Sequence, residues 1–132
     1  MPVFVDTSAI FALLDNDDQY HQTSQEGWLT LVDRSEALVT SNYVLVETIA
    51  LVTRRLGFQA VRDFQTDFAP VLRVYWVDEL LHERAIAALL TAGDRSLSLV
   101  ACVSFELMRR FSTDTAFAFD AHFVQQGFRC IP

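Results

Sequence analysis

Two aspartates stand where α/β proteins usually carry out chemistry. Asp6 follows the apolar run 3–5, and Asp120 follows the run 115–119; both runs are typical of strands. In a parallel sheet, ligands collect at the carboxyl ends of the strands. Each aspartate has an alternative role as the N-cap of the helix that follows it. Position alone therefore does not decide between chemistry and capping.

Glu47 is the residue that favours chemistry. It is the only charge between Tyr43 and Thr53, in a segment that is apolar nearly all round and is therefore predicted to be a buried helix. A buried carboxylate is costly unless it is paired, protonated or metal-bound. No cation stands three or four residues away to pair with it. A functional cleft is favoured over a long-range structural ion pair as the explanation.

These acidic residues are expected to meet in one cleft. The strand ends at Asp6, Ser41-Asn42 and Asp120 share one edge of a parallel sheet, and Glu47 lies just over one turn beyond Asn42. Carboxylates about 4 Å apart repel by about 1–4 kcal/mol. A hard divalent cation removes this penalty, and ligands that are all oxygen favour Mg²⁺ or Mn²⁺. Such a metal activates water and stabilises charge on phosphate, so the pattern predicts phosphodiester hydrolysis.

Strands alternate with helices along the chain. Strands are predicted over 3–5, 37–41, 71–77, 115–119 and 128–131, and helices over 9–14, 21–33, 43–55, 58–68, 79–90, 99–110 and 121–126. This alternation predicts a three-layer α/β/α sandwich with a mostly parallel sheet of four or five strands. At 132 residues, the chain is interpreted as one domain, 1–132.

The composition predicts a cytoplasmic protein without a membrane span. Apolar residues make up 52% of the chain and its mean hydropathy is +0.24, but no window holds 18 uninterrupted apolar residues. The amino end lacks a basic region and runs straight into a strand, so no signal peptide is predicted. The apolar excess instead suggests a partner or an oligomer interface.

The charged residues, cysteines and histidines limit which partners and metal sites the chain is predicted to have. A net charge of −7 weakens tight nonspecific binding to nucleic acid, but every cation is an arginine, which pairs with phosphate and stacks on bases. RNA therefore stays open as a partner beside bound metal ions. Cys102 and Cys130 have no metal-ligand spacing and are predicted to be reduced thiols. The histidines form no HxxxH pair, so no zinc site is predicted.

Four segments carry a resemblance to a known family. They are VDTSA at 5–9, TSNYVLVET at 40–48, SLVACVSF at 98–105 and AFDAHF at 118–123, followed by Gly127-Phe128. In order and spacing they resemble the successive motifs of PIN-domain proteins, and above all those of VapC-type toxins of type II toxin–antitoxin systems. The resemblance covers essentially the whole chain.

The resemblance implies an activity, partners and a set of site residues. It implies a PIN-like fold, Mg²⁺- or Mn²⁺-dependent cleavage of RNA (tRNA, rRNA or mRNA), a homodimer, and neutralisation by a VapB-type antitoxin. Carried over by position, it implies Asp6, Glu47 and Asp120 as the catalytic metal ligands. Ser8 and Asn42 match residues that support the site.

One position departs from the family pattern. The third acidic residue of the family falls at Ala101, near the start of a helix where the helix dipole would also favour an aspartate. The alanine is therefore expected to silence or impair the site, whether it is a natural loss or a substitution of aspartate. Asp94, seven residues earlier, is interpreted as a loop or capping residue and not as a replacement.

Other function classes fit the residues less well. The same fold without catalysis would bind RNA or an antitoxin as a module, and a cleavage assay with and without aspartate at position 101 separates this class. A phospho-accepting signalling domain also uses an acidic cluster with Mg²⁺, but it places a lysine beside the phosphate, and this chain has none. Phosphatases of the DxDxT type need a second aspartate where Ser8 stands.

Overall fold

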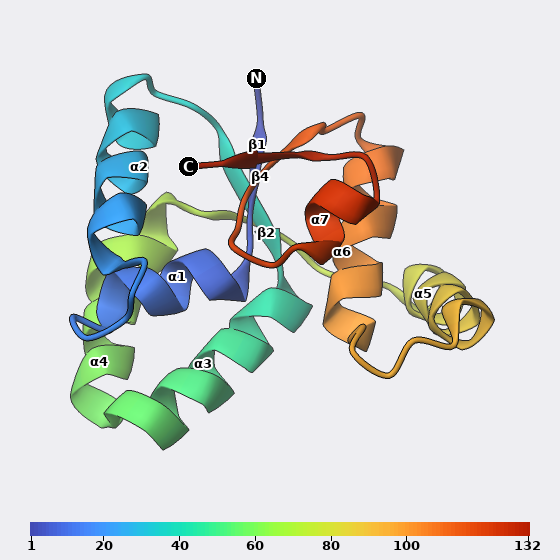
Figure 1. Ribbon diagram of the computed structural model, residues 1–132, viewed down its shortest axis with the longest axis horizontal. Helices are drawn as coiled ribbons and strands as arrows, with labels where there is room; N and C mark the ends of the chain where they lie inside the picture. The colour runs from blue at the N-terminus through green and yellow to red at the C-terminus, as the bar shows by residue number, and fades with distance from the viewer.

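The computed structural model describes residues 1–132 and contains a five-stranded sheet between layers of helices (Figure 1). The strands are β1 (Val3–Val5), β2 (Leu38–Ser41), β3 (Arg73–Tyr75), β4 (Thr115–Phe117) and β5 (Arg129–Ile131). Their order is β3-β2-β1-β4-β5, and every neighbouring pair is parallel. The predicted α/β sandwich with a parallel sheet is confirmed.

The helices flank this sheet on both sides. They are α1 (Thr7–Leu14), α2 (His21–Asp33), α3 (Asn42–Leu56), α4 (Phe58–Asp63), α5 (Glu79–Ala92), α6 (Leu99–Arg110) and α7 (His122–Gln125). In Figure 1, α1, α2 and α4 lie to the left of the sheet and α5, α6 and α7 to the right, with α3 below. None of the helices combines the length and the apolar character that a membrane span requires.

The strand order reverses between β1 and β4. From β1 the chain builds β2 and β3 toward one edge of the sheet, then returns to the other side of β1 to form β4 and β5. Open α/β sheets bind ligands at the carboxyl ends of the strands at such a reversal. Asp6 follows β1 directly and Asp120 follows β4 closely, so the topology places these two aspartates on either side of the reversal.

Short polar side chains cap the helices that leave the strand ends. Asp6 accepts a hydrogen bond from the Ser8 backbone N–H at the start of α1, and Ser41 accepts one from Val44 at the start of α3. Asp78 and Ser98 do the same for α5 and α6. Capping satisfies N–H groups that have no partner inside the helix. Asp6 therefore has the N-cap role that the sequence left open, which does not exclude a second role.

The prediction that the helix carrying Glu47 is buried all round is wrong. Only Val44, Thr48 and Val52 of α3 are buried, whereas the Val46 side chain is 68% exposed. These three residues recur every four positions, so they form one stripe, and the rest of the chain covers no more than that stripe. Glu47 is half-buried as a result.

Two predicted strands are shorter in the structure for identifiable reasons. The strand predicted over 71–77 narrows to β3, because Val71 ends a short 3₁₀ turn, η2 (Ala69–Val71), that follows the π-helical turn η1 (Phe64–Phe68). The strand predicted over 115–119 ends at Phe117. The Phe119 N–H leaves the sheet and donates to Ser8 Oγ at 2.9 Å. This bond starts the loop that carries Asp120.

A buried hydrogen bond fixes α1 against α3. Thr7 Oγ1 and Thr48 Oγ1 are 2.9 Å apart, and both residues are buried. A Thr48→Val variant keeps the shape but leaves this pair unmade, so it should lower the free energy of unfolding by about 1–2 kcal/mol. Urea unfolding measures the change. Thr30→Val, which removes an exposed bond to the Glu26 carbonyl, is the matched control and should cost less; equal losses would contradict the prediction.

Candidate active site

Asp6 is a buried carboxylate at the end of the central strand. Only 6% of the surface of Asp6 is exposed. Ser8 donates two hydrogen bonds to Asp6 Oδ2, from its backbone N–H at 3.1 Å and from its hydroxyl at 2.6 Å. β1 is covered on both faces, with all three residues buried, so the backbone that carries Asp6 is held rigidly. Ser8, predicted as a supporting residue, is thus in direct contact with Asp6.

The pKa of Asp6 is raised by its burial and by the negative charges around it. Burial raises this pKa from 3.8 to about 6, against the lowering effect of the two hydrogen bonds from Ser8. The negative charges of Glu47 and Asp120 raise it further. The structure therefore brings the three predicted carboxylates near enough for two of them to act electrostatically on the third. Glu47 comes from α3 and Asp120 from the loop between β4 and α7.

Ser8 also connects the end of β1 to the loop that carries Asp120. Its hydroxyl donates to Asp6 and accepts from the Phe119 N–H at 2.9 Å. The Phe119 ring stacks on Tyr20 with ring centroids 4.5 Å apart. Figure 1 shows this loop passing beside the starts of α1 and α3, below the middle of the sheet. One hydroxyl thus links Asp6 to the residue that precedes Asp120.

Asp120 is held by a residue two positions further along the chain. Its Oδ1 accepts a bond from the His122 backbone N–H at 2.9 Å, and the His122 Nδ1 atom lies 2.7 Å from the same oxygen. The far nitrogen of the ring lies 3.8 Å from Asp94 Oδ2. Hydrogen bonds from Ser96 are the main cause that lowers the pKa of Asp94, with a smaller contribution from His122. Asp94 is a loop-capping residue, as predicted.

Asn42 bonds to the backbone after β3 and not to the acidic group. Its Oδ1 accepts a hydrogen bond from the Val77 N–H at 2.7 Å, which ties the start of α3 to the end of the β3 segment. It makes no hydrogen bond to the three carboxylates. Cys130 was not expected near the site, but burial and then the charges of Asp6 and Asp120 raise the pKa of its thiol. Both cysteines are free.

The donor set fits a hard divalent cation in its chemistry. Asp6 and Glu47 take part in no ion pair; the ion pairs of the structure are Met1–Glu36 and those of His122 with Asp94 and Asp120. Carboxylate oxygens without a protein cation beside them are the ligands that Mg²⁺ and Mn²⁺ prefer. The carboxylates are not drawn together into a finished cage, since no three acidic, histidine or cysteine side chains lie within metal-holding distance.

Comparison with known proteins settles the family. The sequence profile of the PIN domain matches residues 3–128. The chain belongs to the PIN domain family. It is of the VapC type: it is 36% identical over 127 residues to the 23S rRNA-specific endonuclease VapC20 of Mycobacterium tuberculosis, across 96% of this chain and 95% of that relative. The family predicted from the four sequence segments is confirmed.

Solved structures agree with this PIN fold. The crystal structure of Mycobacterium tuberculosis VapC20, described as a sarcin–ricin loop cleaving toxin, superposes with a TM-score of 0.82 and covers 96% of this chain and 95% of that one. FitAcB from Neisseria gonorrhoeae superposes with a TM-score of 0.68 at 16% sequence identity, and the match covers 100% of this chain and 97% of that one. VapBC2 from Rickettsia felis, in a crystal structure with a DNA fragment from their promoter, superposes with a TM-score of 0.67 at 12% sequence identity. The match covers 98% of this chain and 97% of that one. The latter two share the fold.

Ala101 sits in the first turn of α6 of this PIN domain. Its side chain is buried, with 4% of the residue exposed, and its N–H donates to the capping hydroxyl of Ser98 at 3.0 Å. α6 packs against α3, the helix that carries Glu47. The position where the resemblance implies an acid is therefore an enclosed one at the positive end of a helix.

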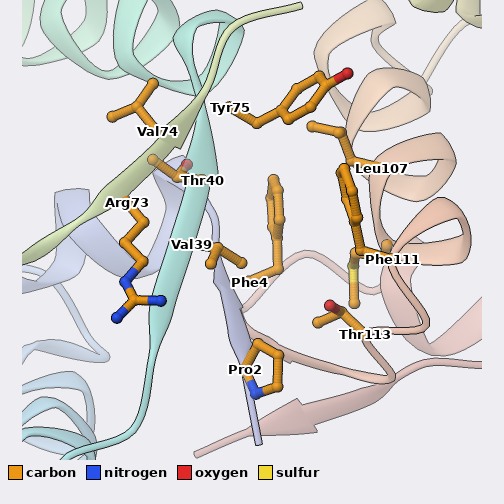
Figure 2. Close-up of a pocket in the computed structure, with 11 residues that line it drawn as sticks. Pro2, Phe4, Val39, Thr40, Arg73, Val74, Tyr75, Leu107, Phe111 and Thr113 are labelled. Atoms are coloured by element: carbon orange, nitrogen blue, oxygen red, sulfur yellow. The ribbon is translucent and has the colours of Figure 1, made fainter.

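An apolar cavity of about 270 Å³ lies away from the acidic site (Figure 2). It lies between the sheet and the carboxyl end of α6, and Phe4, Val39, Tyr75, Leu107 and Phe111 are among its lining residues. None of the three carboxylates lines it. The cavity, which residues 73–75 of the edge strand β3 help to line, is therefore separate from the candidate acidic site.

His122 is the residue near the site to which the sequence assigned no role. Its place two residues after Asp120, in an Asp-x-His sequence, is a signal that a local turn brings the ring back to the carboxylate. Nothing in the sequence indicated that Asp94 and Ser96 contact the His122 ring, because both residues precede His122 by more than twenty positions.

Proposed function

We propose that this PIN domain is a metal-dependent endoribonuclease toxin that cleaves RNA phosphodiesters and is neutralised by an antitoxin. The observation that carries the proposal is the buried Asp6, whose pKa of about 6 reflects burial and the nearby charges of Glu47 and Asp120, without a protein cation beside it. Such a cluster is costly to the fold. Binding of Mg²⁺ or Mn²⁺ accounts for its presence.

The proposed mechanism assigns each residue a task at the cleft. Asp6, Glu47 and Asp120 bind the cation through carboxylate oxygens, and Ser8 holds Asp6 in one orientation. When bound, the divalent cation activates water and stabilises negative charge on the phosphate. Hydrolysis breaks one phosphorus–oxygen bond of the RNA backbone and adds water across it. Ribosomal RNA is the proposed substrate class, because the 36% identical relative is a 23S rRNA-specific endonuclease. A ribosomal target is consistent with a cytoplasmic location, which is part of the proposal.

Cleavage of a ribosomal RNA fragment tests this proposal. The chain, incubated with an RNA that contains the sarcin–ricin loop, should cut it slowly with Mn²⁺ or Mg²⁺ and not with EDTA. An Asp6→Asn variant should lose the cleavage. Equal cleavage with EDTA would contradict metal dependence.

Ala101 supports a second candidate function on the same fold. A PIN domain without its third acid could bind RNA or the antitoxin without cutting. RNA binding measured by fluorescence anisotropy, together with the absence of cleavage both in this chain and in its Ala101→Asp variant, would favour this binding module over the nuclease.

We further propose a homodimer and a VapB-type antitoxin as protein partners. Large apolar side chains remain exposed on several elements: Val46 of α3, Phe58 of α4, Trp76 after β3 and Leu90 of α5. Partners commonly cover exposed apolar side chains when these gather into a patch, and the proposal assigns that role to these residues. Light scattering at micromolar concentration should give the mass of two chains, and a monomeric mass would contradict the dimer.

A further inference from the structure

One oxygen of Asp120 is fully occupied by its neighbour and the other is free. The His122 backbone N–H and the His122 Nδ1 atom both lie within hydrogen-bond distance of Oδ1, at 2.9 and 2.7 Å. No hydrogen bond reaches Oδ2. The turn over residues 120–122 therefore fixes the rotation of this carboxylate and leaves its second oxygen without a hydrogen bond from the protein.

The imidazole ring is itself held from its far side. Its Nε2 atom lies 3.2 Å from Ser96 Oγ and 3.8 Å from Asp94 Oδ2. Ser96 is fixed in turn, since its hydroxyl and its N–H donate to Asp94 Oδ1 at 2.7 and 2.9 Å. The connection between α5 and α6 is thus tied to the loop after β4 through one ring.

We propose that His122 is a positioning residue for Asp120, and that Ser96 and Asp94 orient the His122 ring. The proposal rests on the function proposed above, because it assigns to Asp120 Oδ2 the task of binding the cation. The partner of a metal ligand sets the direction in which that ligand points, and its loss typically costs about 10- to 100-fold in metal affinity. Asp94 then influences the cation only through His122 and does not replace the missing acid at position 101.

If His122 had a purely structural role at this turn, its backbone alone would be sufficient. The backbone N–H of His122 alone completes the turn at Asp120, and any residue at position 122 supplies it. The ring adds a second donor to the same oxygen. Variants that change the ring but keep the turn therefore separate positioning from folding.

The test is the affinity of the full chain for Mn²⁺ in the absence of RNA, measured by electron paramagnetic resonance. His122→Leu should weaken the affinity for Mn²⁺ by about 10- to 100-fold. His122→Asn, whose side-chain amide N–H takes the place of the Nδ1–H group, should recover most of this loss. His82→Leu is the matched control: it removes the other half-buried ring that bonds a side chain, Tyr43, and should leave the affinity unchanged. Unfolding in EDTA verifies that each variant folds.

Each outcome decides between the proposals. If His122→Leu binds Mn²⁺ as tightly as the unmodified chain, or if the asparagine variant is as weak as the leucine variant, the positioning role is overturned and the metal site stands. If neither the unmodified chain nor its Ala101→Asp variant binds Mn²⁺, the metal site of the proposed function is overturned, and this proposal falls with it.

Discussion

An Ala101→Asp variant should cleave RNA at least about 10- to 100-fold faster than the unmodified chain, since even the loss of a residue that only orients a metal ligand costs this much. Position 101 is the third residue of α6, buried, and at the positive end of the helix. A carboxylate there would add a fourth acid to the group formed by Asp6, Glu47 and Asp120. Initial rates on one RNA at one Mn²⁺ concentration measure the effect.

The control for this prediction separates charge from size. Ala101→Asn adds a side chain of nearly the same volume without the negative charge, so it should not raise the rate. Equal rates for the unmodified chain and the aspartate variant would refute the assignment of position 101 as a ligand position. A rise with asparagine as large as with aspartate would attribute the gain to packing.

An Asp6→Asn variant should make the metal-free protein more stable while removing cleavage. The pKa of Asp6 is raised from 3.8 to about 6 in the folded state, so ionising this carboxyl at neutral pH opposes folding. Each pKa unit corresponds to about 1.4 kcal/mol, which sets an upper bound of about 3 kcal/mol. Asparagine has no charge to bury and still accepts the bonds from Ser8. We expect a gain of about 1–3 kcal/mol in unfolding free energy near pH 7.5 in EDTA.

The pH dependence of this gain has a definite sign. Between 3.8 and about 6 the folded protein holds a proton on Asp6 that the unfolded chain has released. The stability contribution of that proton is present below the lower value and is lost as the pH rises through the upper one. The difference between Asp6→Asn and the unmodified chain should therefore be small near pH 4 and reach its full size above about pH 6. Urea unfolding at several pH values measures it.

Asp78→Asn is the matched control for Asp6→Asn. It makes the same change of charge at another helix N-cap, but Asp78 is exposed. Asparagine caps as well as aspartate, so the stability of this variant should stay within about 0.5 kcal/mol of the unmodified chain. A gain at Asp78 equal to that at Asp6 would attribute the effect to the net charge of −7 and not to burial.

Much of the fold follows from residues close together in the chain. Periodicity predicts α2 over the same residues, 21–33, that form it in the structure, and it predicts α6 over 99–110 with Ser96 or Ser98 as its cap; the structure has Ser98. Local signals suffice because a cap bonds an N–H two or three residues away and a helical stripe repeats every three or four residues. The unbroken apolar run before Asp6 likewise predicts a central strand.

The extent of burial along α3 could not be read from the chain. The sequence shows apolar residues all round this helix, but which of them are covered depends on what packs there. Val44, Thr48 and Val52 meet the core, and Val46 remains exposed. An apolar pattern does not distinguish a face that the same chain buries from one that a partner covers. Glu47 was therefore expected deeper than it lies.

The sequence by itself determined most of the strands and helices and the PIN motifs, and it predicted which acidic residues form the site. Only the tertiary structure decided how these residues are held. The Ser8 hydroxyl donates to Asp6 and accepts from the Phe119 N–H, 111 positions after Ser8, and His122 stands between Asp120 and the distant Asp94. The physical reason is range: capping and periodicity act over one or two helical turns, whereas a carboxylate's orientation and pKa depend on groups that only the folded sheet brings beside it.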